Sequence, residues 1–393
     1  MKALICGAGI AGLTLAWHLE RVGWDVELVE RAPAFREGGY MIDFFGPGYE
    51  VAEMMGLRPR LDDLRYPIST INYVDRDGKP TSSLKMPPDI DRIASLLRGD
   101  LARMIHGDVH APVRYSTSVD EVEQADSGVS VRLTDGTRRE VDLLVGADGA
   151  HSRVRELVFG DEHRFLRYLG HHAAAYIFTD EDLSRRVGMR YQMLTVPGLM
   201  IGAYALRGGR VAVLFLRRDP DPALPEDPAA VLRRDYGDLG WILPEVLDRC
   251  PSPPELYYDQ VTQIEMAEWS RGRVALLGDA CQAVSLFAGH GASMAMAAAW
   301  VLTDELRGAD GDLPGALARY RRRMQPTIAD TQRFGRGFTR WMAPPSQWRI
   351  RARDGIMRLA SLPGVNRLLV NSITAGSGTL ITRRPTRLER LGR

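Results

Sequence analysis

The chain has 393 residues, of which 45% are hydrophobic and 26% are charged, and these proportions exclude a disordered, collagenous or coiled-coil protein. The formal net charge of +1 gives no electrostatic reason to expect nucleic acid or an anionic membrane as a partner. Cys6, Cys250 and Cys281 are too few and too widely spaced for a disulfide framework or a metal cluster, so we expect no metal and a cytoplasmic location.

The N-terminal segment predicts a β-α-β unit. An apolar run over residues 2–6 ends at Gly7, and residues 11–22 carry leucine and alanine at helical spacing. Residues 25–29 then alternate between apolar and polar side chains, as a second strand does.

The pattern changes several times along the next part of the chain. Residues 47–57 and 93–106 predict helices. A turn-rich strand region lies between them at about 66–90, with a hairpin turn at 75–79. Three short β runs follow within residues 112–148.

Consecutive hairpins between residues 164 and 218 predict an antiparallel sheet, unlike the β-α-β start. Its expected strands are 173–178, 190–196, 199–206 and 211–217. The spacing further along predicts a helix at 228–249, strands at 257–266 and 273–277, and a mostly helical segment at 311–393.

One stretch imitates a membrane helix, because residues 280–303 carry no formal charge and are long enough to cross a bilayer. However, the stretch contains Gln282, Ser285 and His290, and a Gly-x-Gly break interrupts it. We therefore expect a buried loop that leads into a core helix, and no membrane span.

This order of elements predicts an α/β fold in which a Rossmann-like nucleotide-binding domain is interrupted by an antiparallel β-sheet substrate domain. A helical C-terminal region follows. The expected bounds are 1–65, 91–163 and 267–340 for the first domain, 66–90 and 164–266 for the second, and 341–393 for the C-terminal region.

The first motif that carries chemistry is Gly-Ala-Gly-Ile-Ala-Gly at residues 7–12, between a predicted strand and a predicted helix. There the glycines permit a tight turn, a close approach of backbone to a pyrophosphate and close helix–strand packing. Glu30 ends the second strand, where a carboxylate can accept hydrogen bonds from ribose hydroxyls. The expected dinucleotide-binding residues are Gly7, Gly9, Ile10, Ala11, Gly12, Glu30 and Arg31.

Three further motifs decide between nicotinamide and flavin cofactors. They are Arg98-Gly-Asp-Leu101, Asp142-Leu-Leu-Val-Gly-Ala-Asp148-Gly149-Ala-His-Ser-Arg153, and Gly272-Arg-Val-Ala-Leu-Leu-Gly-Asp279-Ala-Cys-Gln with Ala288-Gly-His-Gly291-Ala-Ser. Together with the glycine-rich turn, they resemble the motifs of the p-hydroxybenzoate hydroxylase-like (class A) FAD-dependent flavoprotein monooxygenases, in the family's order. The resemblance implies a Rossmann-like FAD-binding domain with an inserted substrate domain.

The resemblance also implies roles for individual residues. Arg98 and Asp148 would lie near the flavin pyrophosphate, Asp279 would bind the ribityl chain, and Gly289, Gly291 and Ala292 would bring a helix N-terminus to the flavin ring. A plain alternative exists for two of them: Asp279 as a helix N-cap, and Asp148-Gly149 as a turn with an internal salt bridge.

Two positions depart from the family pattern. Gln282 stands where the family often has histidine, and Leu286 where a proline usually lines the oxygen-reaction side of the flavin. The strands of the second domain carry aromatic and soft apolar side chains, half of which we expect to fill the core, because alternation sends neighbours to opposite faces. The expected substrate-lining residues are Tyr176, Phe178, Tyr191, Met193, Tyr204, Phe215, Leu286 and His290.

The function implied by the resemblance is FAD-dependent hydroxylation of an aromatic small molecule. The aromatic and soft apolar strand residues predict a bulky, mostly apolar aromatic or polycyclic substrate, such as a secondary metabolite. NADPH or NADH would act as the transient reductant, and O2 would react through a flavin C4a-hydroperoxide. No catalytic acid or base is identified from the sequence. The alternatives are a flavin oxidase or dehydrogenase, a halogenase, and a flavin-binding protein without turnover. We expect a monomer or homodimer with no nucleic-acid partner.

Overall fold

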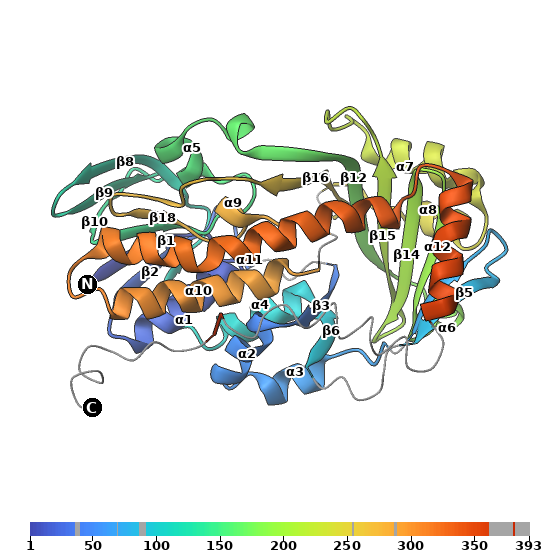
Figure 1. Ribbon diagram of the computed structural model, residues 1–393, viewed down its shortest axis with the longest axis horizontal. Coiled ribbons are helices and arrows are strands. Elements are labelled where there is room, and N and C mark those ends of the chain that lie inside the picture. The colour runs from blue at the N-terminus through green and yellow to red at the C-terminus, as the bar shows by residue number, and fades with distance from the viewer. Residues whose placement is uncertain are drawn as a thin grey trace.

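The computed structural model describes residues 1–35, 40–68, 70–85, 92–253, 255–286, 289–360 and 380–381. A parallel sheet with its helices occupies one end of the long axis and an antiparallel sheet the other, while a long helix, α11 (Leu313–Met342), runs along both (Figure 1). The predicted α/β class, with an inserted antiparallel sheet and a helical C-terminal region, is therefore confirmed.

A six-stranded, mostly parallel sheet forms the centre of the first part, in the order β17-β18-β11-β1-β2-β7. The first strand, β1, pairs in parallel with both β2 and β11, as a β-α-β unit requires. The strands in this order are Ser270–Arg271, Val274–Leu276, Leu143–Gly146, Lys2–Cys6, Asp25–Val29 and Val113–Arg114. A three-stranded sheet of β8 (Val119–Ala125), β9 (Gly128–Leu133) and β10 (Arg138–Val141) lies beside it.

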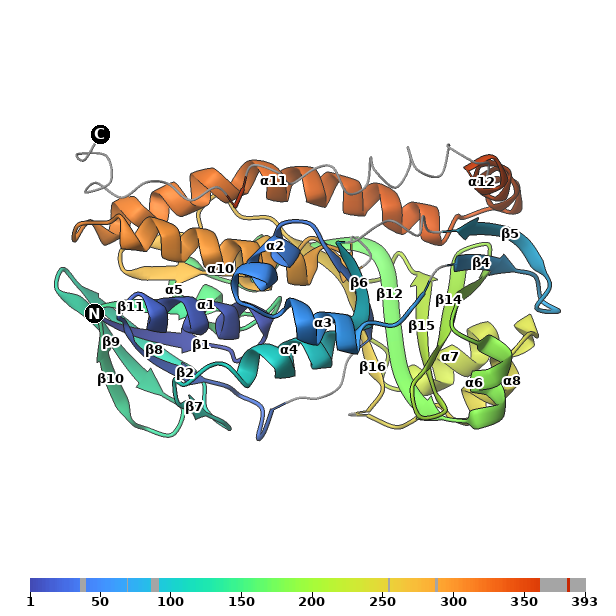
Figure 2. The same ribbon diagram turned by 90° about the horizontal axis from the view of Figure 1, so that it is seen from below.

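Helices cover this sheet. Helix α1 (Ile10–Arg21) packs against α10 (Gly291–Arg307), and α11 packs against α10 (Figure 2). Helix α10 contains residues 291–303, the second half of the apolar stretch that imitates a membrane span, and its alanine-rich middle is buried between its neighbours. Among the described residues, no helix combines the length and the apolar composition that crossing a membrane requires. The shorter helices are α2 (Pro47–Met54), α3 (Arg58–Leu64), α4 (Arg98–His106), α5 (Arg153–Phe159) and α9 (Asp279–Gln282).

The second part is a seven-stranded sheet in the order β16-β12-β15-β14-β13-β4-β5. Its pairs are antiparallel except for β4 with β13. The strands are Tyr257–Ile264, Leu166–Thr179, Arg210–Arg218, Leu199–Leu206, Tyr191–Val196, Thr70–Val74 and Pro80–Lys85.

The two faces of the seven-stranded sheet pack against different elements. The outer face packs against helices α6 (Glu181–Val187), α7 (Pro228–Tyr236) and α8 (Leu243–Asp248). The inner face is turned toward the first part of the molecule. There it packs against the two-stranded sheet of β3 (Met41–Phe45) and β6 (Ile93–Leu97), the end of α11, and α12 (Gln347–Ala360).

The predicted helix over residues 93–106 is partly wrong, because residues 93–97 form strand β6 and only 98–106 are helical. Strand β6 pairs with β3, which the sequence did not predict, in the register Asp43 with Ser95. The two strands are separated by about fifty residues of chain, so neither contains the signal for the other. Likewise, the predicted helix at 228–249 is two helices, α7 and α8, separated at Gly240, whose φ is +72°.

Candidate FAD site and substrate face

A pocket of about 500 Å³ opens at the carboxyl end of the parallel sheet, beside the glycine-rich turn. In α/β proteins, ligands bind at this edge of the sheet, outside the carboxyl ends of the strands. Several residues expected from the sequence line it together: Gly7, Gly9, Glu30, Arg31, Arg98 and Asp148. The pocket thus joins the first three motifs, which are spread over some 140 residues of chain.

The glycines of the turn differ in what they do. A Cβ added at Gly7, whose φ is +108°, would lie 2.3 Å from the carbonyl oxygen of Ala147, and one at Gly12 would lie 2.0 Å from that of Gly7. Both positions are therefore closed by protein backbone. A Cβ at Gly9 would meet nothing within 4 Å, so this backbone faces the open pocket. This is the arrangement that a diphosphate at the N-terminus of α1 requires.

Glu30 is tied to the turn as well as to the pocket wall. Its carboxylate accepts hydrogen bonds from the backbone N–H of Ala8 at 3.0 Å and of Ala32 at 2.9 Å. The carboxylate oxygens have further lone pairs that can accept from ribose hydroxyls. Glu30 therefore orients the glycine-rich loop in addition to its expected role.

Arg98 and Asp279 carry opposite charges, and neither side chain has a hydrogen bond or ion pair with another described residue. Arg98 begins α4, its side chain is exposed, and none of the hydrogen bonds or ion pairs among the described residues uses its guanidinium. Asp279 begins α9 directly after β18, and Gly278 before it lies against Ala11 of the glycine-rich turn. Burial raises the pKa of Asp279, whereas the charge of Arg98 lowers it.

The N-cap alternative for Asp279 receives no support, because Gly278 is the N-cap of α9 and no side chain caps that helix. The Asp279 side chain is nevertheless exposed, so a carboxylate that the protein desolvates is reachable from outside the chain. A ligand there can donate hydrogen bonds to it.

Asp148 lines the pocket but is largely occupied by its own loop. It accepts hydrogen bonds from Ser152 Oγ at 2.5 Å and from the backbone N–H of Arg153 at 2.8 Å and of Val154 at 3.1 Å. The expected internal salt bridge with Arg153 is absent, since Arg153 pairs with Glu156 at 2.7 Å. Asp148 therefore fixes the start of α5, and its loop forms part of the pocket wall.

The arginine that matters structurally in this motif is Arg155, which sequence reasoning missed. Its side chain is fully buried and donates to the carbonyl oxygens of Ala280 at 3.0 Å and Ala150 at 2.7 Å, and to Glu162 at 2.7 Å. Arg155 thereby connects the Asp148 loop to the residue after Asp279. In the sequence, nothing distinguishes Arg155 from the polar residues around it.

The N-terminus of α10 is arranged as the resemblance implies. Added Cβ atoms at Gly289 and Gly291 would meet nothing within 4 Å, so both backbones border open space. Ser293 Oγ donates to the carbonyl oxygen of Phe45 at 2.6 Å and accepts from the N–H of Gly48 at 2.9 Å, which fixes α10 against the end of β3. Ala292, which lies between Gly291 and Ser293 in the chain, is half-buried. The helix dipole favours negative charge at this end.

Comparisons with known proteins agree with this geometry. Residues 1–196 match a family model described as an FAD binding domain. The Mycobacterium tuberculosis (strain ATCC 25618 / H37Rv) protein titled "Uncharacterized protein Rv1260" is 37% identical over 335 residues, which cover 81% of this chain and 88% of the relative. A flavin-dependent monooxygenase of an unknown prokaryotic organism is 28% identical over 347 residues, covering 85% and 88%. The chain belongs to the p-hydroxybenzoate hydroxylase-like FAD-dependent monooxygenases.

A solved structure supports the same family and the fold. The crystal structure of the tetracycline destructase Tet(51) matches with a TM-score of 0.78 and 28% identity, covering 92% of this chain and 96% of that one. The protein is therefore an FAD-dependent monooxygenase, and FAD is its cofactor. The glycine-rich pocket and the Arg98–Asp279 pair are the features of this chain that fit FAD.

The inner face of the seven-stranded sheet carries three of the eight expected substrate residues. Tyr191, Met193 and Tyr204 lie on this face, in clusters that also include Met200, Leu214 and Leu286. His290, the N-cap of α10, lies with its ring centroid 4.6 Å from that of Phe45. These residues surround the region between the sheet and the start of α10.

Three more of the expected substrate residues lie on the outer face. Tyr176, Phe178 and Phe215 pack under the outer helices, and the hydroxyl of Tyr176 donates to the carbonyl oxygen of Val246 at 2.8 Å. These three residues fill the core between the sheet and α8 and do not face the FAD-binding part. The alternation rule correctly paired Tyr176 with Phe178 and Tyr191 with Met193, but the side that each pair takes depends on the helices packed against the sheet.

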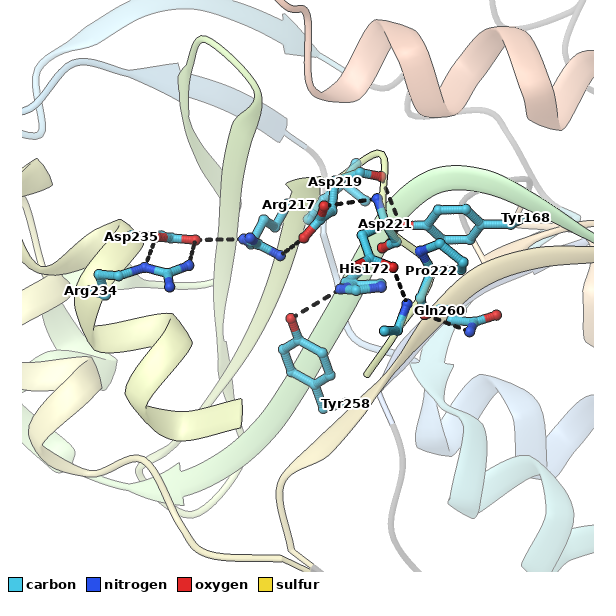
Figure 3. A network of polar contacts seen from close by, with 12 residues as sticks. Tyr168, His172, Arg217, Asp219, Asp221, Pro222, Arg234, Asp235, Tyr258 and Gln260 are labelled. Carbon is cyan, nitrogen blue, oxygen red and sulfur yellow. Dashed lines mark hydrogen bonds and ion pairs between the residues drawn. The ribbon is translucent and has the colours of Figure 1, made fainter. Parts of the chain in front are cut away.

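A polar network also lies on the outer face, and its members are bonded to one another (Figure 3). Arg217 on β15 donates to Asp219 and, at 2.5 Å, to Asp235 on α7. The hydroxyl of Tyr258 and Nδ1 of His172 are 3.3 Å apart. These contacts join β12, β15, β16 and α7, which indicates a structural role.

Three residues around the cleft escaped the sequence analysis. Tyr40 and Tyr257 have ring centroids 6.1 Å apart and lie near the charges of Arg98 and Asp279. His151 lines the pocket, with Nδ1 3.0 Å from Glu162 and Nε2 3.6 Å from Asp259 on β16. These two carboxylates raise the pKa of His151 to about 9. All three depend on contacts between distant segments, so no local pattern marks them.

Proposed function

We propose that this monooxygenase hydroxylates a bulky, mostly apolar aromatic or polycyclic small molecule, with NADPH or NADH as the transient reductant, in secondary metabolism. The observation that supports this most directly is the composition of the inner face, where Tyr191, Met193, Met200, Tyr204 and Leu214 meet the FAD-binding part of the molecule. Tyr191 and Leu214 are only partly buried on this face, whereas the other three are buried beneath them or their neighbours. Partly exposed aromatic and apolar groups of this kind favour a substrate with several rings. The structural relative Tet(51) is named for a polycyclic compound, tetracycline.

In this proposal FAD extends from the glycine-rich pocket toward the N-terminus of α10. Gly9 and Arg98 bind the diphosphate, Glu30 binds the adenosine ribose, and Asp279 accepts hydrogen bonds from the ribityl chain. The glycines at 289 and 291 allow the backbone to approach the ring. Bound FAD supplies the reduction of O2 and the transfer of one oxygen atom to the substrate, with water as the other product.

The residues of this chain contribute binding, orientation and the exclusion of water. The start of α10 stabilises negative charge on the reduced cofactor without a charged side chain. The inner face holds an aromatic ring system against the cofactor and keeps solvent from the reacting atoms. Phe45 and His290 close the region from the side of β3.

A substrate screen tests the proposal. Purified holoenzyme is mixed with NADPH or NADH, and the rate of nicotinamide oxidation is compared across naphthols, indoles, anthraquinones and small benzoates. We expect polycyclic and indolic compounds to stimulate the oxidation and small benzoates to leave it at the basal rate. Strong coupled turnover of a simple benzoate, without any response to the larger compounds, would contradict the proposed substrate class.

A further inference from the structure

Asp43 is a carboxylate that neither the FAD-binding residues nor the polar network of the outer face uses. It lies in the middle of β3, directly opposite Ser95 of β6, and accepts a hydrogen bond from Ser95 Oγ at 2.5 Å. Its side chain is exposed, although Phe44 and Leu96 beside it are buried. Burial nevertheless raises the pKa of Asp43, and the bond from Ser95 lowers it. Met41, two residues before Asp43 on the same side of β3, packs in one cluster with Tyr191 and Tyr204 of the seven-stranded sheet. Asp43 therefore borders the contact between β3 and the inner face, which is here called the recess.

The groups that face Asp43 come from the inner face of the seven-stranded sheet. Tyr191 on β13 and Tyr204 on β14 have ring centroids 5.5 Å apart. Burial raises the pKa of both tyrosines, and the charge of Asp43 raises it further. The hydroxyl of Tyr204 accepts a hydrogen bond from the N–H of Met41 at 2.7 Å, which holds β3 against the sheet. The recess is otherwise bordered by Met41, Ile177 and Ile68. Tyr66, whose N–H donates to the carbonyl oxygen of Ser95 at 2.7 Å, belongs to the same cluster. The described surroundings are therefore apolar apart from this carboxylate, one serine and three phenols.

The recess lies next to the region assigned to the flavin ring. Asp43 and Phe45 project from the same side of β3, because strand residues two apart share a face. Phe45 contacts His290 at the start of α10, with 4.6 Å between ring centroids. Two residues of a strand span about 7 Å, roughly the length of a fused pair of aromatic rings. A substrate ring system beside α10 therefore reaches Asp43 with its far end.

We propose that Asp43 binds the polar group of the substrate, accepting a hydrogen bond from a hydroxyl or N–H on its aromatic ring system. This inference rests on the proposed function and narrows its substrate class. A carboxylate in an apolar recess is stabilised by a donor and repels another carboxylate. Hydroxylated or N–H-bearing polycyclic compounds are thus selected, and aromatic carboxylates are rejected.

A simpler role for Asp43 would be to hold β3 against β6 through Ser95. The β3–β6 ladder already pairs five residues of each strand, and the Asp43 carboxylate retains lone pairs beyond the one that Ser95 uses. Two variants distinguish substrate binding by Asp43 from its role in holding the two strands together. Asp43→Asn keeps the shape and removes the charge, whereas Ser95→Ala removes the tie between the strands and keeps the carboxylate.

The experiment titrates the holoenzyme with three probes and follows the absorbance change of the bound flavin. The probes are 2-naphthol, its O-methyl ether 2-methoxynaphthalene, and 2-naphthoate. We expect the unaltered protein to bind 2-naphthol roughly 10- to 100-fold more tightly than the ether, as for the loss of a charge-assisted hydrogen bond, and to bind the naphthoate most weakly. Asp43→Asn should reduce this preference about tenfold or more and leave the affinity for the ether unchanged, whereas Ser95→Ala should retain it. The FAD content of each variant reports an intact fold.

Each contrary result overturns the proposal. Equal binding of 2-naphthol and its ether, tighter binding of 2-naphthoate, or no spectral response to 2-naphthol excludes Asp43 as the substrate anchor. An equal loss of preference in Ser95→Ala and Asp43→Asn assigns Asp43 to the strand pairing alone. The proposed function survives all of these results if another polycyclic compound stimulates NADPH oxidation, and fails only when none does, so the two failures are distinguishable.

Discussion

The outer and inner faces of the seven-stranded sheet both carry polar and aromatic side chains but use them differently. On the outer face these polar groups are bonded within the protein, and Arg217 lies between Asp219 and Asp235 (Figure 3). The hydroxyl of Tyr236 on α7 donates to the carbonyl oxygen of Leu216 at 2.9 Å. Toward the inner face, Asp43 has one hydrogen bond, and among the described residues the hydroxyl of Tyr191 has none.

This difference separates structural polar groups from ligand-binding ones. Buried polar groups are normally paired within the protein, and those left with spare capacity indicate water or a ligand. The same criterion distinguishes Arg98 and Asp279, which lack partners in the described part of the chain, from Arg155, whose two terminal nitrogens donate three hydrogen bonds within the protein. Substitutions on the two sides should therefore affect different properties.

The largest effect, on the affinity for FAD, is expected at charged residues that have no hydrogen-bond partner within the described part of the chain. Asp279→Ala removes a charge-assisted hydrogen bond and should weaken FAD binding by roughly 10- to 150-fold, because such bonds contribute about 1.5–3 kcal/mol. Equilibrium dialysis of the apoprotein with FAD measures the change. Arg98→Ala should act in the same direction, whereas Arg58→Ala, at the start of α3 and paired with Glu53, serves as the matched control. Unchanged FAD affinity in Asp279→Ala would remove this residue from the cofactor site.

On the outer face the same kind of change should affect stability instead. Arg217→Ala leaves Asp219 without its partner and breaks the link from β15 to α7. We expect the free energy of unfolding to fall by about 1.5–3 kcal/mol, with the FAD dissociation constant unchanged. Urea unfolding of the apoprotein measures the first quantity and dialysis the second. A loss of FAD affinity without a loss of stability would reverse the assignment of this network.

A matched pair of hydroxyl deletions sharpens the comparison further. Tyr176→Phe removes a hydrogen bond to Val246 on the outer side and should cost about 1 kcal/mol of stability without a change in turnover. Tyr191→Phe removes a hydroxyl that faces the recess and should change the KM for the substrate while stability stays the same. Steady-state kinetics of both variants measure turnover and KM, and thermal unfolding measures their stability. Equal stability losses in the two variants would mean that Tyr191 is also structural.

How far the sequence predicts this molecule depends on whether the signal is local. The glycine-rich turn and Glu30 lie within one β-α-β unit, so their pattern predicts both fold and cofactor. Asp43 could not be found, because its environment arises from β3 pairing with β6 and from Tyr191 on another sheet. The inner and outer faces could not be told apart either, since alternation gives two faces and only tertiary packing decides which one the helices cover.

The smallest expected effect concerns the contact between the two parts of the molecule. His151 is held by Glu162 and by Asp259 of β16, and its pKa is raised to about 9, above the value near 6.5 of an unfolded histidine. Its contribution to stability is therefore complete below about pH 6.5 and is lost as the pH rises through about 9. The half-exposed position keeps the effect small, on the order of 1–2 °C in Tm.

Thermal unfolding between pH 6 and pH 10 measures this contribution. The difference in Tm between the unaltered protein and His151→Gln should be largest at the acidic end and should shrink toward the alkaline end. A difference that grows with pH would show that His151 is neutral in the folded protein.

The central claim is that this chain uses FAD to place one atom of O2 into a ring compound held between the inner face and α10. The most direct test is turnover under ¹⁸O-labelled O2 with the polycyclic compound that most strongly stimulates NADPH oxidation, followed by mass spectrometry of the product. The account predicts a product heavier by a single ¹⁸O atom. A product without ¹⁸O, formed while the labelled oxygen appears as hydrogen peroxide, would contradict it and identify the protein as an oxidase.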